Sequence, residues 1–322
     1  MTLELGTKMS ENPNTPINEA EILESFAVPP RTGRFKTVLN WIVREPFGTL
    51  GAFLIMLMVF VSVFAPVLNT TDPMGFGVDI LQAPSVDHFF GTDRTGKDLW
   101  SRVLYGGRIS LKIGLATVII GTFAGTVFAL LAGFFGGFVD FIFGRITDIL
   151  FAVPTFLLAL TLSTSIGADM PDLPGIPSGE LVVIIAISVG FMPGIFRIMR
   201  GLVLEQRGTE YVLAAEVTGA SQTRIMARHI LPNMLGLMIV ATSITLPAAI
   251  LTESALSFLG AGVPPGSPSW GADLSGASRT YLMRAPWLAV FPGLALSLTV
   301  FGFNIFGDAL RDTLDPRLRG KI

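Results

Sequence analysis

The chain contains no cysteine and only two histidines among its 322 residues. The absence of cysteine excludes disulfide bonds, thiolate metal sites and a cysteine nucleophile. His88 and His229 lie far apart in the sequence and match no metal-ligand spacing. No nucleophile, base and orienting group occur together either, so the sequence predicts no metal, no cofactor and no enzymatic activity.

Charged residues are also scarce. They make up 14% of the chain, against 51% hydrophobic residues, and the mean hydropathy is +0.64. A soluble domain of this size has about a quarter of its residues charged. The balance therefore predicts an integral membrane protein, and the net charge of −2 gives no general attraction for nucleic acid.

Six apolar runs reach the length of about 20 residues that a membrane-spanning helix needs. They cover residues 49–68, 109–135, 141–163, 181–199, 234–259 and 286–306. Residues 1–44 are mostly polar, with five Glu and several Pro and Asn, whereas a signal peptide begins basic and soon becomes apolar, so we expect the first run to be a retained helix. The runs predict an all-α bundle of six transmembrane helices.

Prolines 154, 193 and 247 fall inside the third, fourth and fifth runs. A proline inside a helix removes a hydrogen bond and kinks the helix. In a membrane, the freed carbonyl must be satisfied by neighbouring helices or by a water-lined cavity. The three kinks are equally compatible with a bundle that encloses a pathway and with ordinary packing between helices.

The distribution of basic residues predicts the orientation. If the N-terminus is cytoplasmic, fifteen of the 22 Lys and Arg residues fall on the cytoplasmic side of the six runs. Because basic residues concentrate in cytoplasmic loops, this favours both termini in the cytoplasm. The polar segment between the fourth and fifth runs then lies in the cytoplasm as well.

That segment, EYVLAAEVTGASQTRIMARHILPN at 210–233, predicts two short helices. Residues 210–218 are good helix formers, Gly219 suits the left-handed residue that closes a helix, and Ser221 suits the N-cap of the next. We expect Pro232 to end this second helix. One face of it carries Ile225, Met226, His229 and Ile230. The helix pair would either cap the bundle or form a docking surface.

The segment resembles the EAA loop of permease subunits in binding-protein-dependent ABC importers. The pattern is Glu-Ala-Ala, three residues, Gly, then a hydrophobic residue with Leu-Pro, and it is matched by Ala214, Ala215, Gly219, Ile230, Leu231 and Pro232. Leu213 stands at the usual Glu position, and Glu216 follows three residues later. The resemblance implies that these residues of the EAA loop, 210–232, including Glu216, form a coupling helix in a groove of a cytoplasmic ATPase subunit.

Three further stretches resemble the dipeptide, oligopeptide and nickel permeases, and in particular the second permease of a pair. They are HFFGTDRTGKDLWSRVLYGGRISL at 88–111, ESALSFLGAGVPPGSPSWG at 253–271 and FGDALRDTLDPRLRG at 306–320. The resemblance implies the type I ABC importer, or MetI-like, fold with a five-helix core at 108–308. A cytoplasmic tail at 1–44, a first helix and outer segment at 45–107 and a second tail at 309–322 would complete the chain.

The resemblance also implies a bacterial inner-membrane importer that carries peptides. Its partners would be a homologous permease, two ATPase subunits, an external solute-binding protein and membrane lipid. Nickel, opines, glutathione and sugars are alternative cargoes in the same family. A secondary transporter is a more distant alternative, but it would need several acids at the membrane midplane or an internal repeat of broken helices, and the sequence has neither.

Three other polar features have simpler interpretations. Residues 91–98 nearly match a phosphate-binding P-loop, but Asp98 stands where a Ser or Thr must ligate magnesium, so we expect a structured outer segment, with a docking role for Lys97 and Arg102 as an alternative. Glu253 lies about 30 Å into its run, and we expect it to bond loop 260–285 rather than substrate. Asp148 is expected to pair with Arg145 or with a helix end.

Overall fold

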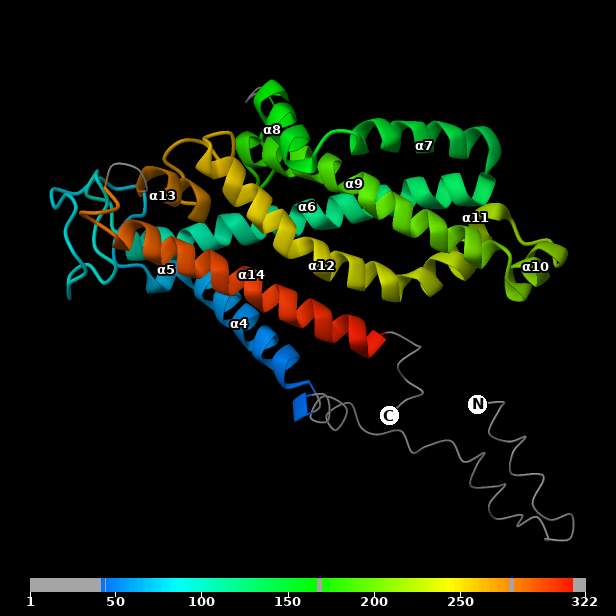
Figure 1. Ribbon diagram of the computed structural model, residues 1–322, viewed down its shortest axis with the longest axis horizontal. Helices are drawn as coiled ribbons and strands as arrows, with labels where there is room; N and C mark the ends of the chain where they lie inside the picture. The colour runs from blue at the N-terminus through cyan, green and yellow to red at the C-terminus, as the bar shows by residue number, and fades with distance from the viewer. Residues whose placement is uncertain (1–41, 44, 167–169, 278–280, 315–322) are drawn as a thin grey trace, which may run out of the picture. The chain divides into compact units, whose positions relative to one another are not determined.

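The computed structural model describes residues 42–43, 45–166, 170–277 and 281–314. The chain divides into a unit of residues 1–44 and a unit of residues 45–322. Apart from Ile42 and Val43, the predicted N-terminal tail lies outside the described residues, as does the Asp-Pro-Arg-Leu stretch at 315–318. Every regular element in the described parts of the second unit is a helix (Figure 1).

The longest connection between the described helices is the segment 69–98. The helices are α4 (Pro46–Val63), α5 (Ala65–Leu68), α6 (Leu99–Phe135), α7 (Gly137–Phe151), α8 (Thr155–Ile166), α9 (Ser178–Arg207), α10 (Glu210–Val217), α11 (Gln222–Ile225), the π-helical turn η1 (Met226–Ile230), α12 (Leu231–Phe258), α13 (Trp270–Ala277) and α14 (Trp287–Leu314).

Five helical stretches are long and apolar enough to cross a membrane. They are Pro46–Val63, Leu99–Phe135, Ser178–Arg207, Gln222–Phe258 and Trp287–Thr313. A sixth span results if α7 and α8 are counted together, although they are bent by 91° at the break between them. The prediction of an all-α membrane protein with about six spans is thereby confirmed for the described residues.

The centre of the unit is the pair α6 and α9, which pack most extensively against each other. They run in the same direction, because Gly121 of α6 lies against Ser188 of α9 and Gly133 lies against Val203. A Cβ on Gly133 would lie 2.8 Å from the Cβ of Val203, so only glycine allows this approach. Small residues bring membrane helices close enough for backbone and side-chain packing, which here joins the two central spans.

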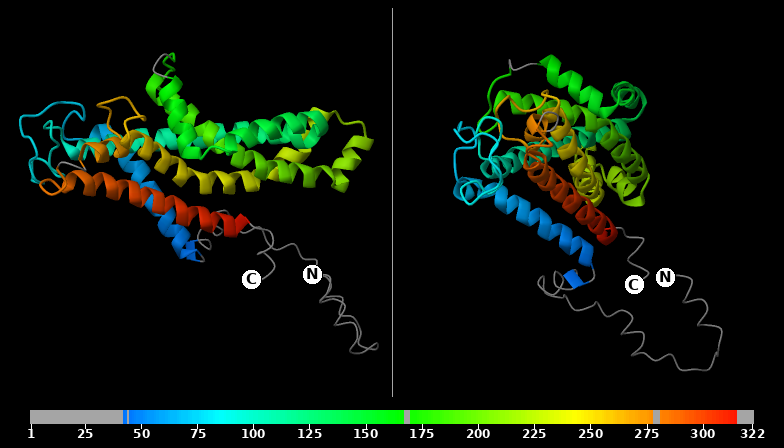
Figure 2. Two further views of the ribbon diagram at one scale, coloured as in Figure 1. Left: turned by 45° about the horizontal axis from the view of Figure 1, so that its top comes forward. Right: turned by 60° about the vertical axis from the view of Figure 1, so that its left-hand side comes forward.

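The remaining spans surround this pair. α12 packs against both α6 and α14, and α4 packs against α14. We call the end of the unit with α10 and α11 the helix-pair end, and the end with residues 69–98 the long-loop end; Figures 1 and 2 show them at opposite ends of the long helices. α6, α9 and α14 run toward the helix-pair end, and α12 runs back from it.

The prediction that residues 141–163 form one continuous helix is wrong. α7 ends at Phe151, residues 152–154 form a turn, and α8 leaves at 91° (Figure 1). Pro154 lacks the N–H that would continue the helix and disfavours a helical conformation at Val153. Pro193 and Pro247, by contrast, lie inside the unbroken helices α9 and α12.

The second span begins earlier than predicted, at Leu99 rather than near 109. Asp98 caps this helix, because its carboxylate accepts a hydrogen bond of 2.9 Å from the N–H of Ser101. Ser101 and Arg102 in the first turns are polar but buried. Together with Arg108, directly before the predicted start, they interrupt the apolar run in the sequence without interrupting the helix, which explains the error in the prediction.

Candidate functional site

The helix pair at residues 210–232 is fixed to the bundle by its apolar face. Val212 and Ala215 of α10, Ile225 of α11 and Ile230 of η1 are all buried. They belong to one hydrophobic cluster with residues of α6 and α9 that include Phe134, Phe196 and Val203. The pair is therefore part of the bundle's core at the helix-pair end, and a force applied to it acts directly on α6 and α9.

The turn between the two helices has the predicted form. Gly219 has a φ of +79°, a conformation that favours glycine. Its N–H bonds the carbonyl of Glu216 over 2.9 Å, and the N–H of Ala220 bonds the carbonyl of Ala215 over 3.0 Å. Ser221 caps α11 by accepting a hydrogen bond of 3.4 Å from the N–H of Arg224. The predictions for Gly219 and Ser221 are confirmed.

The prediction that Pro232 ends the second helix is wrong. α11 passes through the π turn Met226–Ile230 directly into α12, whose first turn contains Pro232. The N–H of Leu231 bonds the carbonyl of Met226, five residues back. A proline clashes with the carbonyl four residues before it, and a π turn widens the helix at that point. The second helix of the pair therefore continues into the α12 span without a break.

A network of polar side chains, which the sequence analysis missed, links the helix pair to both flanking spans. The hydroxyl of Tyr211 in α10 donates to Oε1 of Gln206 in α9. Nδ2 of Asn233 in α12 donates to the Tyr211 hydroxyl over 2.9 Å and to the carbonyl of His229 over 2.8 Å. One tyrosine thus connects the end of α9, the helix pair and the beginning of α12.

The opposite face of α10 is exposed and partly apolar. Val217 is 89% exposed and Leu213, one turn earlier, is 49% exposed. Ala214, Glu216 and Gly219 are exposed as well. We call Leu213 and Val217 the α10 ridge. Of the residues predicted for coupling, Ala214, Glu216, Gly219 and Pro232 thus lie at the surface, Leu231 is half-buried, and Ala215 and Ile230 belong to the core.

Comparison with known proteins places this arrangement in a family. A sequence profile described as "Binding-protein-dependent transport system inner membrane component" matches residues 125–320, more than half of the chain. The match includes α7 to α14 and the whole helix pair. The chain belongs to this family of permeases.

Relatives of the permease match it over nearly its whole length. A dipeptide transport system permease of Alkalihalophilus pseudofirmus is 35% identical over 316 residues, covering 97% of each chain. An oligopeptide transport system permease of Bacillus subtilis is 39% identical over 272 residues, 84% of this chain and 85% of the relative. A glutathione transport system permease of Pectobacterium atrosepticum is 37% identical over 279 residues, 86% and 89% of the two chains. The permease is accordingly a transport subunit of an ABC importer.

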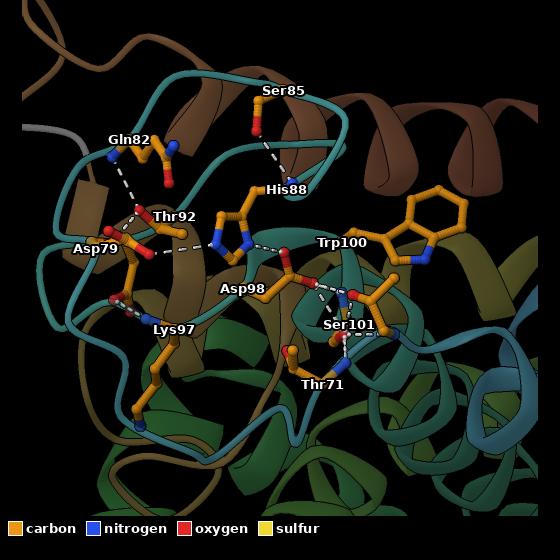
Figure 3. A network of polar contacts seen from close by, with 12 residues as sticks. Thr71, Asp79, Gln82, Ser85, His88, Thr92, Lys97, Asp98, Trp100 and Ser101 are labelled. Carbon is orange, nitrogen blue, oxygen red and sulfur yellow. Dashed lines mark hydrogen bonds and ion pairs between the residues drawn. The ribbon is translucent and has the colours of Figure 1, made fainter.

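At the long-loop end of the permease, a polar network holds residues 69–98 against α6 (Figure 3). Asp98, besides capping α6, lies 3.0 Å from Nδ1 of His88 and accepts a hydrogen bond of 2.9 Å from the Thr70 hydroxyl. The hydroxyl of Thr92 donates to the carbonyl of Asp79 over 2.6 Å. The prediction of a structured segment is confirmed, and His88 has a structural contact that sequence spacing did not indicate.

The P-loop-like stretch at 91–98 is closed on itself. The carboxylate of Asp93 accepts hydrogen bonds from the N–H groups of Thr95 and Lys97, at 2.7 and 2.9 Å. In a P-loop, such N–H groups face the phosphate. The Lys97 side chain lies over the ring of Phe76, 4.7 Å from its centre, and is buried. The contacts of Lys97 and the buried Arg102 therefore hold the segment together, and a docking role for these two residues stays a prediction.

Glu253 is fully buried in α12 near the long-loop end. Its carboxylate accepts hydrogen bonds from the hydroxyls of Ser257 at 2.8 Å, Ser269 at 3.1 Å and Ser254 at 3.3 Å. Ser269 belongs to the segment between α12 and α13. The predicted bond from Glu253 to loop 260–285 is thereby confirmed, and the carboxylate fixes this loop on the span.

Arg102 and Asp273 form a second buried connection at this end. Nη2 and Nε of Arg102 lie 2.5 and 2.7 Å from Oδ1 of Asp273, and Nη1 of Arg102 donates to the carbonyl of Pro73 over 3.0 Å. Burial raises the pKa of Asp273 to about 6, although the positive charge of Arg102 acts in the opposite direction. The pair joins α6, α13 and the loop that follows α5.

Asp148 of α7 pairs with Arg197 of α9 rather than with Arg145, at 2.9 Å between Nη2 and Oδ1. The prediction of Arg145 as its partner is therefore wrong. Asp148 and Arg145 are three residues apart on α7, but α9 packs against α7 and brings the Arg197 guanidinium closer. A contact between helices decides this pairing, and sequence spacing within one helix does not show it.

Proposed function

We propose that the permease carries peptides inward across the bacterial cytoplasmic membrane and is driven by ATP hydrolysis on separate subunits. The cargo is supported by relatives named for dipeptide and oligopeptide transport. A glutathione permease among the relatives is compatible with it, because glutathione is itself a small peptide. Both termini and the helix-pair end lie in the cytoplasm, which is supported by the excess of basic residues on that side.

The partners are a homologous permease, two ATPase subunits and a solute-binding protein on the outer side. The permease supplies half of the pathway, surrounded by lipid, and the binding protein delivers the peptide to the long-loop end. The compact, hydrogen-bonded segment at 69–98 gives that end a defined surface. The permease itself does no bond chemistry.

The observation that carries the proposal is the α10 ridge. Leu213 and Val217 are exposed apolar side chains on a short helix whose other face is locked into the core. Adjacent exposed apolar residues on a fixed helix are typical of a surface that enters a partner's groove. Because Leu213 stands where the family pattern has Glu, the contact with the ATPase in this permease is apolar at that position.

Coupling follows from how the helix pair is held. When ATP closes the ATPase dimer, the groove moves the α10 ridge. The Tyr211 network and the uninterrupted helix from α11 into α12 transmit this movement to α9 and α12 together. The spans then change from an inward-facing to an outward-facing arrangement, a two-state transition driven by differential contacts with the ATPase.

A matched pair of substitutions tests this function. Leu213→Ser removes apolar area from the α10 ridge, and Leu204→Ser makes the same change in α9 at a side chain of similar exposure, 44% against 49%. In the assembled importer in vesicles, we expect Leu213→Ser to lower peptide uptake per ATP hydrolysed several-fold and Leu204→Ser to leave it near wild type. Equal behaviour of the two variants would refute the docking role, and absence of peptide uptake by the wild type would refute the cargo.

A further inference from the structure

The break between α7 and α8 lies beside the middle of α9. The Thr155 hydroxyl, just after the break, is 3.4 Å from the carbonyl oxygen of Gly190. At 1.5 Å per residue, Gly190 is about 18 Å from the beginning of α9 at Ser178 and about 25 Å from its end at Arg207. Because α9 crosses the membrane, the break lies within the apolar layer.

The break is also exposed on the surface of the chain. Phe151, Val153 and the rest of residues 151–154 are exposed. A helix break leaves backbone N–H and C=O groups without helical partners, and hydrocarbon cannot satisfy them. Irregular backbone at membrane depth occurs where it is covered by protein or lines water. This surface of α7 and α8 therefore does not face lipid.

A cavity of about 430 Å³ with charged walls lies between α7 and α9, on the helix-pair side of the break. The residue of its lining that is nearest to the break along α7 is Asp148, three residues before the end of that helix. Two ion pairs form part of its lining. Nε and Nη2 of Arg200 each lie 2.5 Å from an oxygen of Asp140, and Arg197 pairs with Asp148. Arg145 lies over the ring of Phe141 at 5.3 Å and forms no ion pair with any residue that the structure describes. With three arginines and two aspartates, the lining carries one uncompensated positive charge.

The exposure of these charges points to water. The Arg197 and Asp148 side chains are 47% and 54% exposed, although Asp148 lies within about one turn of helix from the break and Arg197 about two turns from Gly190. Charged side chains within a membrane almost always face the bundle interior or a water-filled cavity. The helix break and the half-exposed ion pair are separate observations. Both indicate that the surface formed by α7 and α8 does not face lipid.

We propose that this cavity lies on the water-filled pathway and that Arg145, assisted by Arg197, binds the carboxylate of the transported peptide. The proposal rests on the peptide cargo proposed above. A guanidinium presents a planar set of donors that fits a carboxylate, and Arg145 has no carboxylate partner among the described residues. Asp148, three residues after Arg145 on α7, favours the ammonium end of a zwitterionic peptide. Because the site is open to water, binding is weak enough for the peptide to leave.

The absence of cysteine from this chain allows a direct test in the complete importer, with single cysteines introduced into this chain and the label measured on this chain. Gly144→Cys lines the cavity, and its Cβ would meet no other atom within 4 Å. Val153→Cys reports on the break. Phe123→Cys, at a 68% exposed position in α6, is the control for a lipid-facing side chain. The probes are membrane-impermeant methanethiosulfonates, one with a sulfonate and one with a trimethylammonium group.

We expect both reagents to label Val153→Cys and Gly144→Cys but not Phe123→Cys. Relative to the rates of the two reagents with a small thiol in solution, the sulfonate reagent should be favoured about fivefold at Gly144→Cys, because one charge about 8 Å away in water changes the two rates in opposite directions. Adding Arg145→Gln should abolish this preference and lower peptide uptake by the importer at least fivefold, and Arg145→Lys should restore part of both.

Two results would overturn the proposal. If Val153→Cys and Gly144→Cys are as unreactive as Phe123→Cys, another protein chain or lipid covers the cavity. If Gly144→Cys reacts without preference for charge, or if Arg145→Gln leaves uptake unchanged, Arg145 does not hold the carboxylate. Failure of the peptide cargo is distinguishable, because wild-type uptake would then be absent while the labelling rates still report on the water and charge of the cavity.

Discussion

Tyr211 and Asn233 lie 22 residues apart in the sequence, and the Asn233 amide donates a 2.9 Å hydrogen bond to the Tyr211 hydroxyl. The same hydroxyl donates to Gln206, so three helices of the permease meet at one oxygen atom. Movement of α10 therefore acts on the end of α9 and the beginning of α12 together. The proposed coupling depends on this connection as much as on the α10 ridge.

Tyr211→Phe removes the shared hydroxyl and keeps the ring. The hydroxyl makes two hydrogen bonds, and each contributes about 0.5–1.5 kcal/mol, so we expect peptide uptake per ATP hydrolysed to fall at least about fivefold, with normal assembly. Tyr105→Phe is the matched control, since the Tyr105 hydroxyl bonds no residue described by the structure. Vesicle uptake measured beside ATP hydrolysis checks this, and equal coupling in the two variants would contradict it.

Gly219→Ala tests the turn within the helix pair. The positive φ of Gly219 makes a side chain there cost about 1–2 kcal/mol, although nothing lies within 4 Å of its Cβ. We expect the α10 ridge to shift and uptake per ATP to fall, while the amount of folded permease changes little. Gly236→Ala in α12 is the control, because its Cβ also meets open space but no positive φ is involved. Loss of coupling in both variants, or in neither, would count against a role for this turn.

Glu253 is predicted to act structurally. Glu253→Ala leaves the hydroxyls of Ser257 and Ser269 without their acceptor in a buried place, at a cost of about 1–3 kcal/mol for each. Glu253→Gln keeps one acceptor oxygen and should cost less. We expect the apparent melting temperature to fall most in the alanine variant, with uptake per folded importer close to wild type. A well-folded Glu253→Gln variant that transports nothing would instead indicate a direct role for the carboxylate.

Asp273 gives the long-loop end a dependence on pH. Its pKa is raised to about 6, so the folded permease keeps this proton at pH values where the unfolded chain, with a pKa near 3.8, has lost it. The contribution of Asp273 to the free energy of unfolding therefore falls as the pH rises from about 4 to 6, by about 3 kcal/mol in total.

Asp273→Asn removes this titration and is the variant to compare. We expect the melting temperature of wild type, relative to Asp273→Asn, to be higher at pH 4.5 than at pH 7.5. Thermal unfolding in detergent at the two pH values measures it. A difference that is constant, or that grows with pH, would show that the ion pair with Arg102 outweighs the cost of burying the carboxylate.

The sequence predicted those parts of the fold that depend on local patterns. Long apolar runs indicated the spans, and Gly219 and Ser221 indicated the turn, because a left-handed residue and an N-cap are set by their neighbours in the chain. The break at Pro154 was not predictable in the same way. Pro193 and Pro247 have the same chemistry and remain inside continuous helices.

The missed parts of the candidate site are contacts between helices. Asp148 pairs with Arg197 across 49 residues, and Tyr211 meets Asn233 only because the π turn carries the chain directly into α12. The start of the second span was misplaced because Arg102 and Arg108 made residues 99–108 look polar. The partner that allows Arg102 to be buried, Asp273, is 171 residues away. Such pairs follow from tertiary packing, which a single sequence does not show.

The most direct test of the coupling proposal is photo-crosslinking from the α10 ridge. We would replace Val217 with benzoylphenylalanine in the assembled importer and use the same replacement at Phe123 of α6 as the control. The account predicts that residue 217 crosslinks to the ATPase subunit in high yield, that the crosslink blocks peptide uptake, and that residue 123 gives no such product. A Val217 position that does not crosslink to the ATPase in an importer that still transports peptide would contradict it.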